Sequence, residues 1–158
     1  MDPEIKKKAL RKIVHGVYVI SVKGQGKVNA FTATWVTQVS FVPPLVAAGI
    51  RKDGVSYSMI EQGRVFVVNF LGSDQKKLAE HFLKPAHLGG DKLEGIPFVP
   101  GKLGAPVLKE AAAYVECEVR EIHPGGDHAI VVGEVVEAGV QRDVDPLMLK
   151  ETGWNYGG

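Results

Sequence analysis

A series of short segments rich in β-branched and aromatic residues limits what this chain of 158 residues can fold into. Turn residues separate most of these segments, and the regular alternation of strand and helix that builds a parallel doubly wound sheet is missing. We expect strands over residues 16–22, 28–36, 45–50, 65–70, 114–122 and 128–138. The pattern predicts a mainly β fold, an antiparallel barrel with a few helical insertions.

Two kinds of apolar pattern occur in the expected strands. Residues 45–50 and 65–70 are nearly continuous apolar runs, which predicts strands buried on both faces. The segment 114–122 alternates by twos, so Cys117 and its apolar neighbours face the core, while Glu116 and the other charged residues face outward. Cys117, the only cysteine, is therefore expected to be a small core residue and not a reactive thiol.

Three helices are expected around the strands. The first runs through residues 4–13 after an Asp-Pro start, and its five cations predict a solvated face or, alternatively, a face that steers an anionic ligand. The second covers residues 55–62. The third covers residues 74–83, with Ser73 and Asp74 as its cap and with an apolar face.

Length and composition narrow the class of protein. We expect residues 1–158 to form a single domain, since 158 residues are typical of one domain. A formal net charge of +1 gives no signal for binding to nucleic acid or to an anionic membrane. The charged start lacks a hydrophobic signal core, and no apolar run approaches the ~18 residues that cross a bilayer. A cytoplasmic protein is expected. Residues 85–106, rich in Gly and Pro, predict a long surface loop.

Several motifs of catalysis and binding are absent from the sequence. No G-x-x-x-x-G-K-[ST] phosphate loop occurs, and the Gly-Gln-Gly stretch at residues 24–26 is expected to be a hairpin turn because it lies between two strands. The histidine pairs, His81 with His87 and His123 with His128, lack the spacing of zinc ligands, so no metal site is predicted. There is also no G-x-S-x-G elbow for a nucleophilic serine.

Two neighbouring segments carry polar groups in an arrangement that suits a ligand. Residues 29–44 (NAFTATWVTQVSFVPP) are dense in hydroxyl groups. They suit either an edge strand or a surface that presents hydroxyl and amide groups to a planar polar ligand. Residues 51–57 (RKDGVSY) place two cations, a turn and hydroxyl groups at a helix start, which is a combination that holds phosphate. Taken alone, the second segment is also a common exposed turn.

In their order along the chain, these segments resemble the flavin reductase-like family, whose members bind FMN on a split β-barrel. The resemblance rests on NAFTATWVTQVSFVPPLVAAGI, RKDGVSY, VFVVNFL with a following LAEHF, YVECEVREI and GDHAIVVGEVVEA. It extends from about residue 13 to residue 138. It implies a mainly β fold, an antiparallel split β-barrel (FMN-binding split barrel) with a few helices.

The resemblance also implies roles for individual residues. The flavin ring and ribityl chain would lie along Thr32, Ala33, Thr34 and Trp35, although Trp35 also suits core packing. Ser40 would face the same pocket. The FMN phosphate would be held by Arg51, Lys52 and Ser56, with Tyr57 nearby. His128, in a Gly-Asp-His turn, would be the catalytic residue beside the flavin or the nicotinamide, or else a turn residue bonded to its own loop. Trp154 and Tyr156 would either cover the flavin or anchor the end of the chain.

The implied function is that of an NAD(P)H-dependent flavin oxidoreductase. Hydride would pass from NADH or NADPH to FMN, which is expected in preference to FAD, and electrons would go on to a free flavin, a ferric complex or a protein partner. The alternative is an FMN electron carrier resembling flavoredoxin, reduced by a protein partner; a barrel without flavin is a third interpretation. Members of the family are typically homodimers, so we expect a homodimer. Hydride transfer requires an open flavin face and no protein nucleophile, in agreement with the missing serine elbow.

Overall fold

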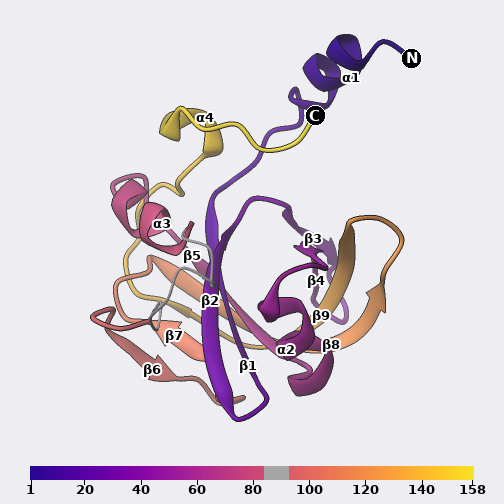
Figure 1. Ribbon diagram of the computed structural model, residues 1–158. Coiled ribbons are helices and arrows are strands. Elements are labelled where there is room, and N and C mark those ends of the chain that lie inside the picture. The colour runs from indigo at the N-terminus through magenta and orange to yellow at the C-terminus, as the bar shows by residue number, and fades with distance from the viewer. Residues whose placement is uncertain (84–92) are drawn as a thin grey trace.

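The chain folds around one antiparallel sheet. The structure is a computed structural model that describes residues 1–83 and 93–158. Seven strands form the sheet in the order β2-β1-β5-β8-β9-β4-β3 (Figure 1). Their bounds are β1 Tyr18–Gly24, β2 Lys27–Ala33, β3 Val36–Ser40, β4 Leu45–Arg51, β5 Val65–Phe70, β8 Ala113–His123 and β9 His128–Val140. A separate hairpin joins β6 (Phe98–Pro100) to β7 (Pro106–Leu108). The prediction of a mainly β, antiparallel architecture is confirmed.

The sheet is curled because its two edge strands are consecutive in the chain. β2 and β3 lie at opposite ends of the strand order, yet only Thr34 and Trp35 connect them. Since an extended chain spans at most about 3.5 Å per residue, the two edges come within roughly 10 Å of each other at this connection. No ladder joins β2 to β3 within residues 1–83 and 93–158. The edges therefore approach each other without pairing, which makes the barrel a split one.

The prediction of one continuous strand over residues 28–36 is wrong. The reason is a change of partner: Ala33 is the last residue of β2 paired with β1, where it lies opposite Tyr18. Two residues later, the carbonyl oxygen of Trp35 accepts a hydrogen bond from the amide of Gly49 in β4, at 2.8 Å. The other five expected strands occur within about two residues of their expected bounds.

The core lies inside the curled sheet. In this core cluster the largest fully buried side chains come from β1, β5 and the helix α2 (Val55–Gly63), whose Ile60 is fully buried. The prediction that residues 65–70 are buried on both faces holds for the four central residues of β5. It is wrong for residues 45–50, where buried and half-buried residues alternate, because only every second side chain of β4 faces the core.

Cys117 and Glu116 show how the long strand β8 uses its two sides. Cys117 is buried in the core as predicted, and burial raises the pKa of its thiol to about 12. Glu116, predicted to face solvent, is 2% exposed. Its carboxylate accepts hydrogen bonds from the amides of Lys102 and Leu103, both at 3.1 Å, in the turn between β6 and β7. The β6–β7 hairpin covers this side of β8, so the outward position is not an exposed one.

The three predicted helices occur, with ends that differ from the predicted ones. The first helix, α1 (Pro3–Leu10), is capped by the Asp2 carboxylate, which accepts from two amides of the first turn. α3 (Lys76–Phe82) begins after Gln75 and not at the predicted cap. Asp74 is instead paired with Arg142, with 3.1 Å between Oδ2 and Nη1. A fourth helix, α4 (Leu149–Thr152), was not predicted.

Two further predictions concern loops and the ends of the chain. Part of the predicted loop 85–106 lies outside the described residues, and the remainder contains the strand β6. α1 and the C-terminal residues lie side by side (Figure 1), where the Arg11 Nε donates to the carbonyl oxygen of Gly157 at 3.2 Å. None of the helices in the described part of the chain is long and apolar enough to cross a membrane.

Candidate functional site

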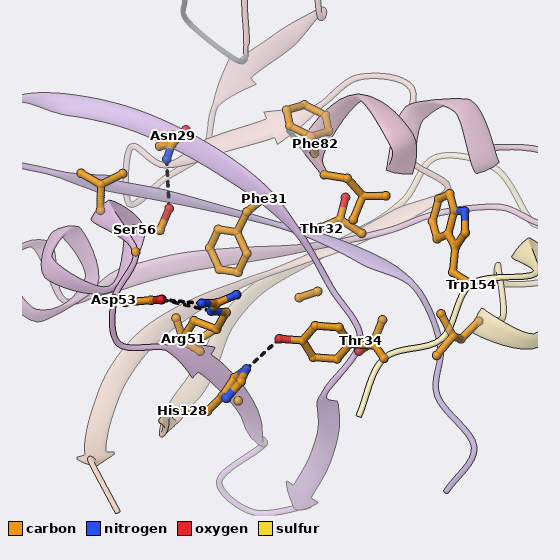
Figure 2. Close-up of a pocket in the computed structure, with 18 of the residues that line it drawn as sticks. Asn29, Phe31, Thr32, Thr34, Arg51, Asp53, Ser56, Phe82, His128 and Trp154 are labelled. Atoms are coloured by element: carbon orange, nitrogen blue, oxygen red, sulfur yellow. Dashed lines mark hydrogen bonds and ion pairs between the residues drawn. The ribbon is translucent and has the colours of Figure 1, made fainter. Parts of the chain in front are cut away.

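A cavity of about 960 Å³ opens where β2, β4, the start of α2, the end of α3 and the C-terminal residues meet (Figure 2). This volume is in the range of small-molecule and cofactor sites. The polar residues around it are Asn29, Thr32, Thr34, Arg51, Asp53, Ser56, His128, Asn155 and Tyr156. The apolar residues and glycines are Phe31, Ala33, Gly49, Ile50, Gly54, Val55, Phe82, Leu83, Leu149 and Trp154. The cavity thus combines apolar walls with a few polar groups.

Thr34, in the connection after β2, carries a buried hydroxyl group without a partner. The residue is 8% exposed, and its Oγ1 is the one buried side-chain polar atom without a hydrogen bond in the described part of the chain. Thr32, two residues earlier, has a partner, because its Oγ1 donates to the carbonyl oxygen of Ala79 at 2.7 Å. A buried unpartnered polar group costs roughly 1–3 kcal/mol. Thr34 also lines the cavity, so its hydroxyl is a buried polar group beside the cavity for which the described part of the chain supplies no partner.

The start of α2 and the end of β4 form a second polar region of the cavity. Gly54 precedes the helix and offers no side-chain cap. Its carbonyl oxygen accepts a hydrogen bond from the Tyr57 amide at 3.2 Å, so the amides of Val55 and Ser56 are the ones at this helix start without an intrahelical acceptor. Ser56 Oγ accepts from Asn29 Nδ2 at 3.0 Å. Arg51 Nε donates to Asp53 Oδ1 at 3.0 Å, and a second contact joins their Nη2 and Oδ2 atoms. A cation, free amides and a helix start together suit an anion such as phosphate.

The electrostatics of Arg51 and Asp53 follow from this ion pair. The Asp53 carboxylate raises the pKa of Arg51, and the guanidinium lowers the pKa of Asp53. Both side chains are largely exposed, at 63% and 67%, so they are within reach of a ligand from solvent. Arg51 therefore stays charged while only part of its guanidinium is engaged by Asp53.

His128, the first residue of β9, lies beside this region and opposite Arg51 in the β4–β9 ladder. Its Nδ1 is 2.7 Å from Asp127 Oδ1, and its Nε2 is 2.7 Å from the hydroxyl of Tyr156. The Trp35 ring packs against it, with 4.5 Å between ring centroids. The hydrogen bond from His128 lowers the pKa of Asp127, and burial raises the pKa of Tyr156. Both nitrogens of the imidazole are thus engaged.

The structure brings six of the ten predicted site residues together at the cavity. They are Thr32, Ala33, Thr34, Arg51, Ser56 and His128. Trp154 and Tyr156, for which two roles were open, also line it. The predicted residues of β2, β4 and α2 thus line one cavity, and their roles in binding a ligand stay a prediction.

Four predicted residues do not line the cavity. Trp35 lies behind His128, where it lines a second cavity of about 670 Å³. Ser40 is at the far end of β3, beyond a register shift. Lys52 points to another turn, since its Nζ donates to the carbonyl oxygen of Pro124 at 3.3 Å. Tyr57 is buried in the core from α2.

Other cavity residues were missed. Asn29, Phe31 and Ala33 are spaced two residues apart along β2 and so share one face of the strand. This period of two was a signal that could have found Asn29 and Phe31. Phe82 and Leu83 come from the end of α3, and no local pattern connects them with β2. Within residues 1–83 and 93–158, no three His, Cys, Asp or Glu side chains gather as metal ligands; His87 lies outside this range.

Comparison with known proteins adds evidence of another kind. A family described as "Flavin reductase like domain" matches residues 10–157. The NADH-dependent FAD reductase of Streptomyces globisporus is 36% identical over 125 residues, which cover 78% of this chain and 68% of that protein. A putative diflavin flavoprotein A 3 of Nostoc sp. is 37% identical over 136 residues, which cover 85% of this chain. The chain spans only 24% of that relative's length.

Solved structures match along most of the chain. The NADH:FAD oxidoreductase SgcE6 of Streptomyces globisporus C-1027, in complex with NAD and FAD fragments, has a TM-score of 0.81 at 30% identity, and covers 92% of this chain and 87% of that one. The flavin reductase HpaC complexed with NADP+ has a TM-score of 0.82 at 27% identity, with 98% and 97% covered. An FMN-binding protein from Thermus thermophilus has a TM-score of 0.75 at 28% identity, with 82% and 72% covered.

Proposed function

Because this chain belongs to the flavin reductase-like family, we propose that its cavity binds a flavin, which the protein reduces with hydride from NADH or NADPH. The observation that carries the proposal is the unpartnered Thr34 hydroxyl in an apolar cavity whose other end holds Arg51 and the uncapped start of α2. A flavin mononucleotide has the matching parts, namely a flat, largely apolar ring with polar edges and a phosphate.

The residues present fit such a group. The apolar wall of Phe31, Phe82 and Trp154 suits the ring, and the Thr34 hydroxyl supplies a hydrogen bond to a polar atom of the ligand. Arg51, with the first amides of α2, would hold the phosphate. FMN is our specific choice because of the resemblance to a family whose members bind FMN. The anionic subsite alone, one cation and one helix start, suits a phosphate of either flavin, and relatives named for FAD and for FMN both exist.

A bound flavin supplies the acceptance of hydride and the release of electrons, while the protein supplies position and charge. Arg51 holds the anionic end, and the apolar wall excludes water from the ring. We propose that His128 contacts the flavin or the nicotinamide, since it lines the cavity beside Arg51. Electrons would then go to a free flavin, a ferric complex or a protein partner.

An electron carrier reduced by a protein partner is the second candidate function. The observation in its favour is that the chain spans only about a quarter of the length of relatives named diflavin flavoproteins, so a domain similar to this chain also occurs within longer proteins. The same cavity would serve both functions. The two differ in whether NADH or NADPH alone reduces the bound flavin.

The assembly and location that accompany the proposal are a homodimer and the cytoplasm. Phe41 and Val42, in the turn between β3 and β4, are 87% and 92% exposed, which supports burial of this turn against a second copy. The single buried thiol is compatible with a reducing compartment. We also propose that residues 1–158 act as one flavin-binding domain. Sedimentation velocity tests the dimer, and Phe41→Ser would yield monomers.

The test of function is an absorption experiment on protein reconstituted with FMN and, separately, with FAD. NADH and then NADPH are added under anaerobic conditions. A bound-flavin spectrum that bleaches rapidly with either nucleotide supports the reductase and identifies the donor. Bound flavin that bleaches with neither points to the electron carrier, and the absence of bound flavin contradicts the proposal.

Two matched double variants locate the binding site in the same experiment. Thr34→Val with Arg51→Ala changes both ends of the cavity. Thr37→Val with Arg120→Ala makes the same chemical changes at exposed positions of β3 and β8, outside the cavity. Flavin binding lost in the first variant and kept in the second supports the cavity. Equal binding in both contradicts it.

A further inference from the structure

Asp127, His128 and Tyr156 form a continuous chain of hydrogen bonds at the wall of the cavity. Asp127 Oδ1 and the Tyr156 hydroxyl oxygen each lie 2.7 Å from one nitrogen of the His128 imidazole. The three residues differ in exposure: the side chain of Asp127 is 94% exposed, whereas that of His128 is 15% exposed. A half-buried imidazole with a hydrogen-bond partner at each ring nitrogen has little freedom to rotate.

The chemistry of the partners fixes where the hydrogens lie. An ionised carboxylate only accepts hydrogen bonds, so Nδ1 of His128 carries the proton that is donated to Asp127. A neutral imidazole has one N–H, so Nε2 is then an acceptor and the Tyr156 hydroxyl donates to it. The oxygen of Tyr156 is left with lone pairs only. It can accept, but not donate, a further hydrogen bond.

Tyr156 belongs to a segment that is itself fastened. Gly157 follows it, accepts a hydrogen bond from Arg11 and lies against the Trp35 ring, which also packs on Tyr156 with 5.2 Å between centroids. Tyr156 lines both the main cavity and the smaller one behind it. The hydrogen bond to His128 therefore forms part of the partition between the two cavities.

We propose that Asp127 is a positioning residue that holds His128 in the Nδ1-protonated form, and that this form presents the Tyr156 oxygen to the cavity as a hydrogen-bond acceptor. The groups that such an acceptor recognises are N–H donors, such as the carboxamide amide of a nicotinamide. Its role toward a nicotinamide nucleotide rests on the proposed function. The hydrogen-bond arrangement itself does not, and it is tested on the protein without ligands.

Several charged and titratable groups face His128 from the elements around it. Arg51 lies opposite it on β4, Asp53 is held by Arg51, and Asp127 and Tyr156 contact it directly. His15 lies across the smaller cavity. Measurement at pH 8.5, where histidine side chains are in general neutral, keeps the test on the position of the proton and away from the titration of these groups.

The protein offers its own internal control. His123, on β8, also has a carboxylate as hydrogen-bond partner. Here the contact is made through Nε2, which is 2.7 Å from Glu121 Oε2. The same rule then assigns the proton of His123 to Nε2. Two histidines five residues apart are thus expected to hold opposite neutral forms. Long-range ¹H–¹⁵N NMR at pH 8.5 distinguishes the two forms by the ¹⁵N shifts of the ring nitrogens.

Variants separate the hydrogen-bond chain from simple fastening of the C-terminal segment. Asp127→Ala is expected to move the His128 proton from Nδ1 to Nε2 without affecting His123. Arg11→Gln releases Gly157 but leaves His128 and its partners in place, and it is expected to keep the wild-type form. His128 protonated at Nε2 in the wild type, or the same change in Arg11→Gln as in Asp127→Ala, would overturn the proposal.

Steady-state kinetics tests the acceptor role. Tyr156→Phe removes the hydroxyl oxygen and is expected to raise KM for the nicotinamide nucleotide about two- to tenfold, as the loss of one neutral hydrogen bond does, with kcat little changed. Arg11→Gln is expected to leave both constants unchanged. An unaltered KM in Tyr156→Phe contradicts the acceptor role. A wild-type protein with the expected imidazole form but no flavin reduction contradicts the proposed function and leaves the hydrogen-bond arrangement intact.

Discussion

Asn69 and Thr34 show two opposite uses of a buried polar side chain in one barrel. Asn69, on β5, is fully buried; its Nδ2 donates to Val19 O and to Ser21 Oγ at 3.1 and 3.0 Å, and its Oδ1 accepts from Leu108 N at 2.8 Å. Thr34 is nearly as buried, yet its hydroxyl has no partner. The first group is used fully by the fold. The second has no such use in the fold, and we propose that it serves a ligand. Burial alone therefore does not distinguish the two groups, whereas their hydrogen bonds do.

The largest effect expected from this comparison is on stability. Asn69→Ala removes the three hydrogen bonds and leaves buried backbone groups unpartnered, which should lower the free energy of unfolding by about 3 kcal/mol or more. Urea denaturation of the protein without ligand measures this. Asn29→Ala is the matched control, because Asn29 makes one side-chain hydrogen bond, at the cavity, and should cost about 1 kcal/mol. Equal losses in the two variants would contradict the distinction.

The second prediction concerns Arg51, where a substitution should affect ligand binding and hardly affect stability. Arg51→Ala removes an exposed cation whose ion pair is screened by solvent, so the urea denaturation midpoint should change little. The same change should weaken FMN binding about tenfold or more, which is the usual effect of losing a charge-assisted phosphate contact. Fluorescence titration of FMN measures the affinity.

Lys52→Ala is the control for Arg51→Ala, because the two cations are adjacent in sequence but only the Arg51 side chain lines the cavity. Lys52 Nζ donates to Pro124 O and does not line the cavity. Its removal should change FMN affinity less than about threefold, through the weak long-range charge effect alone. A larger loss of FMN affinity in Lys52→Ala than in Arg51→Ala would show that Lys52, and not Arg51, holds the phosphate.

The adjacent pair Arg51 and Lys52 also marks a limit of sequence reasoning. The sequence predicted that this turn carries cations at a helix start, because that depends on local composition. It did not predict which cation faces the cavity. That depends on where β4 ends and on the hydrogen bond from the Lys52 amide to Asp127 O, at 3.0 Å, which joins the turn to a segment far along the chain.

The break between β2 and β3 was hidden for a similar reason. Residues 28–36 have strand character throughout, so local pattern predicts one strand. The chain changes its partner from β1 to β4 between Ala33 and Trp35, and partner choice is a long-range property. The wall supplied by Phe82 was beyond residue patterns for the same reason, whereas the motifs of β2, β4 and α2, on which the family resemblance rests, are contiguous in the sequence.

The third prediction concerns Thr34 itself. Thr34→Val keeps the shape of the side chain and removes the unpartnered hydroxyl, so the protein without ligand should be as stable as the wild type or up to about 1 kcal/mol more stable. Flavin affinity should fall about two- to tenfold, as for one neutral hydrogen bond. Thr37→Val, at an exposed position of β3, should alter neither quantity. Loss of stability in Thr34→Val would mean that the hydroxyl has a structural partner after all.

The smallest effect is expected at Asp53, which holds part of the Arg51 guanidinium and places a negative charge beside the proposed phosphate site. Asp53→Asn should tighten FMN binding about two- to fivefold, the range of an exposed charge pair. Arg51 lowers the pKa of Asp53, so the wild-type carboxylate is ionised throughout pH 7–8, which also lies above the second pKa of a phosphate monoester, about 6; the gain should therefore be nearly the same at both ends of this range.

The sign of the acid dependence follows from the same lowered pKa. The ion pair contributes stability that is fully present above the ordinary aspartate pKa of about 4 and is lost as the pH falls through the lower value in the folded protein. Asp53→Asn should therefore lose less stability than the wild type between pH 4 and pH 2, measured by urea denaturation. Suppose that FMN binding does not tighten in Asp53→Asn, while Arg51→Ala abolishes FMN binding. Asp53 would then be needed to orient Arg51, and its carboxylate would assist the cation instead of competing with the phosphate for it.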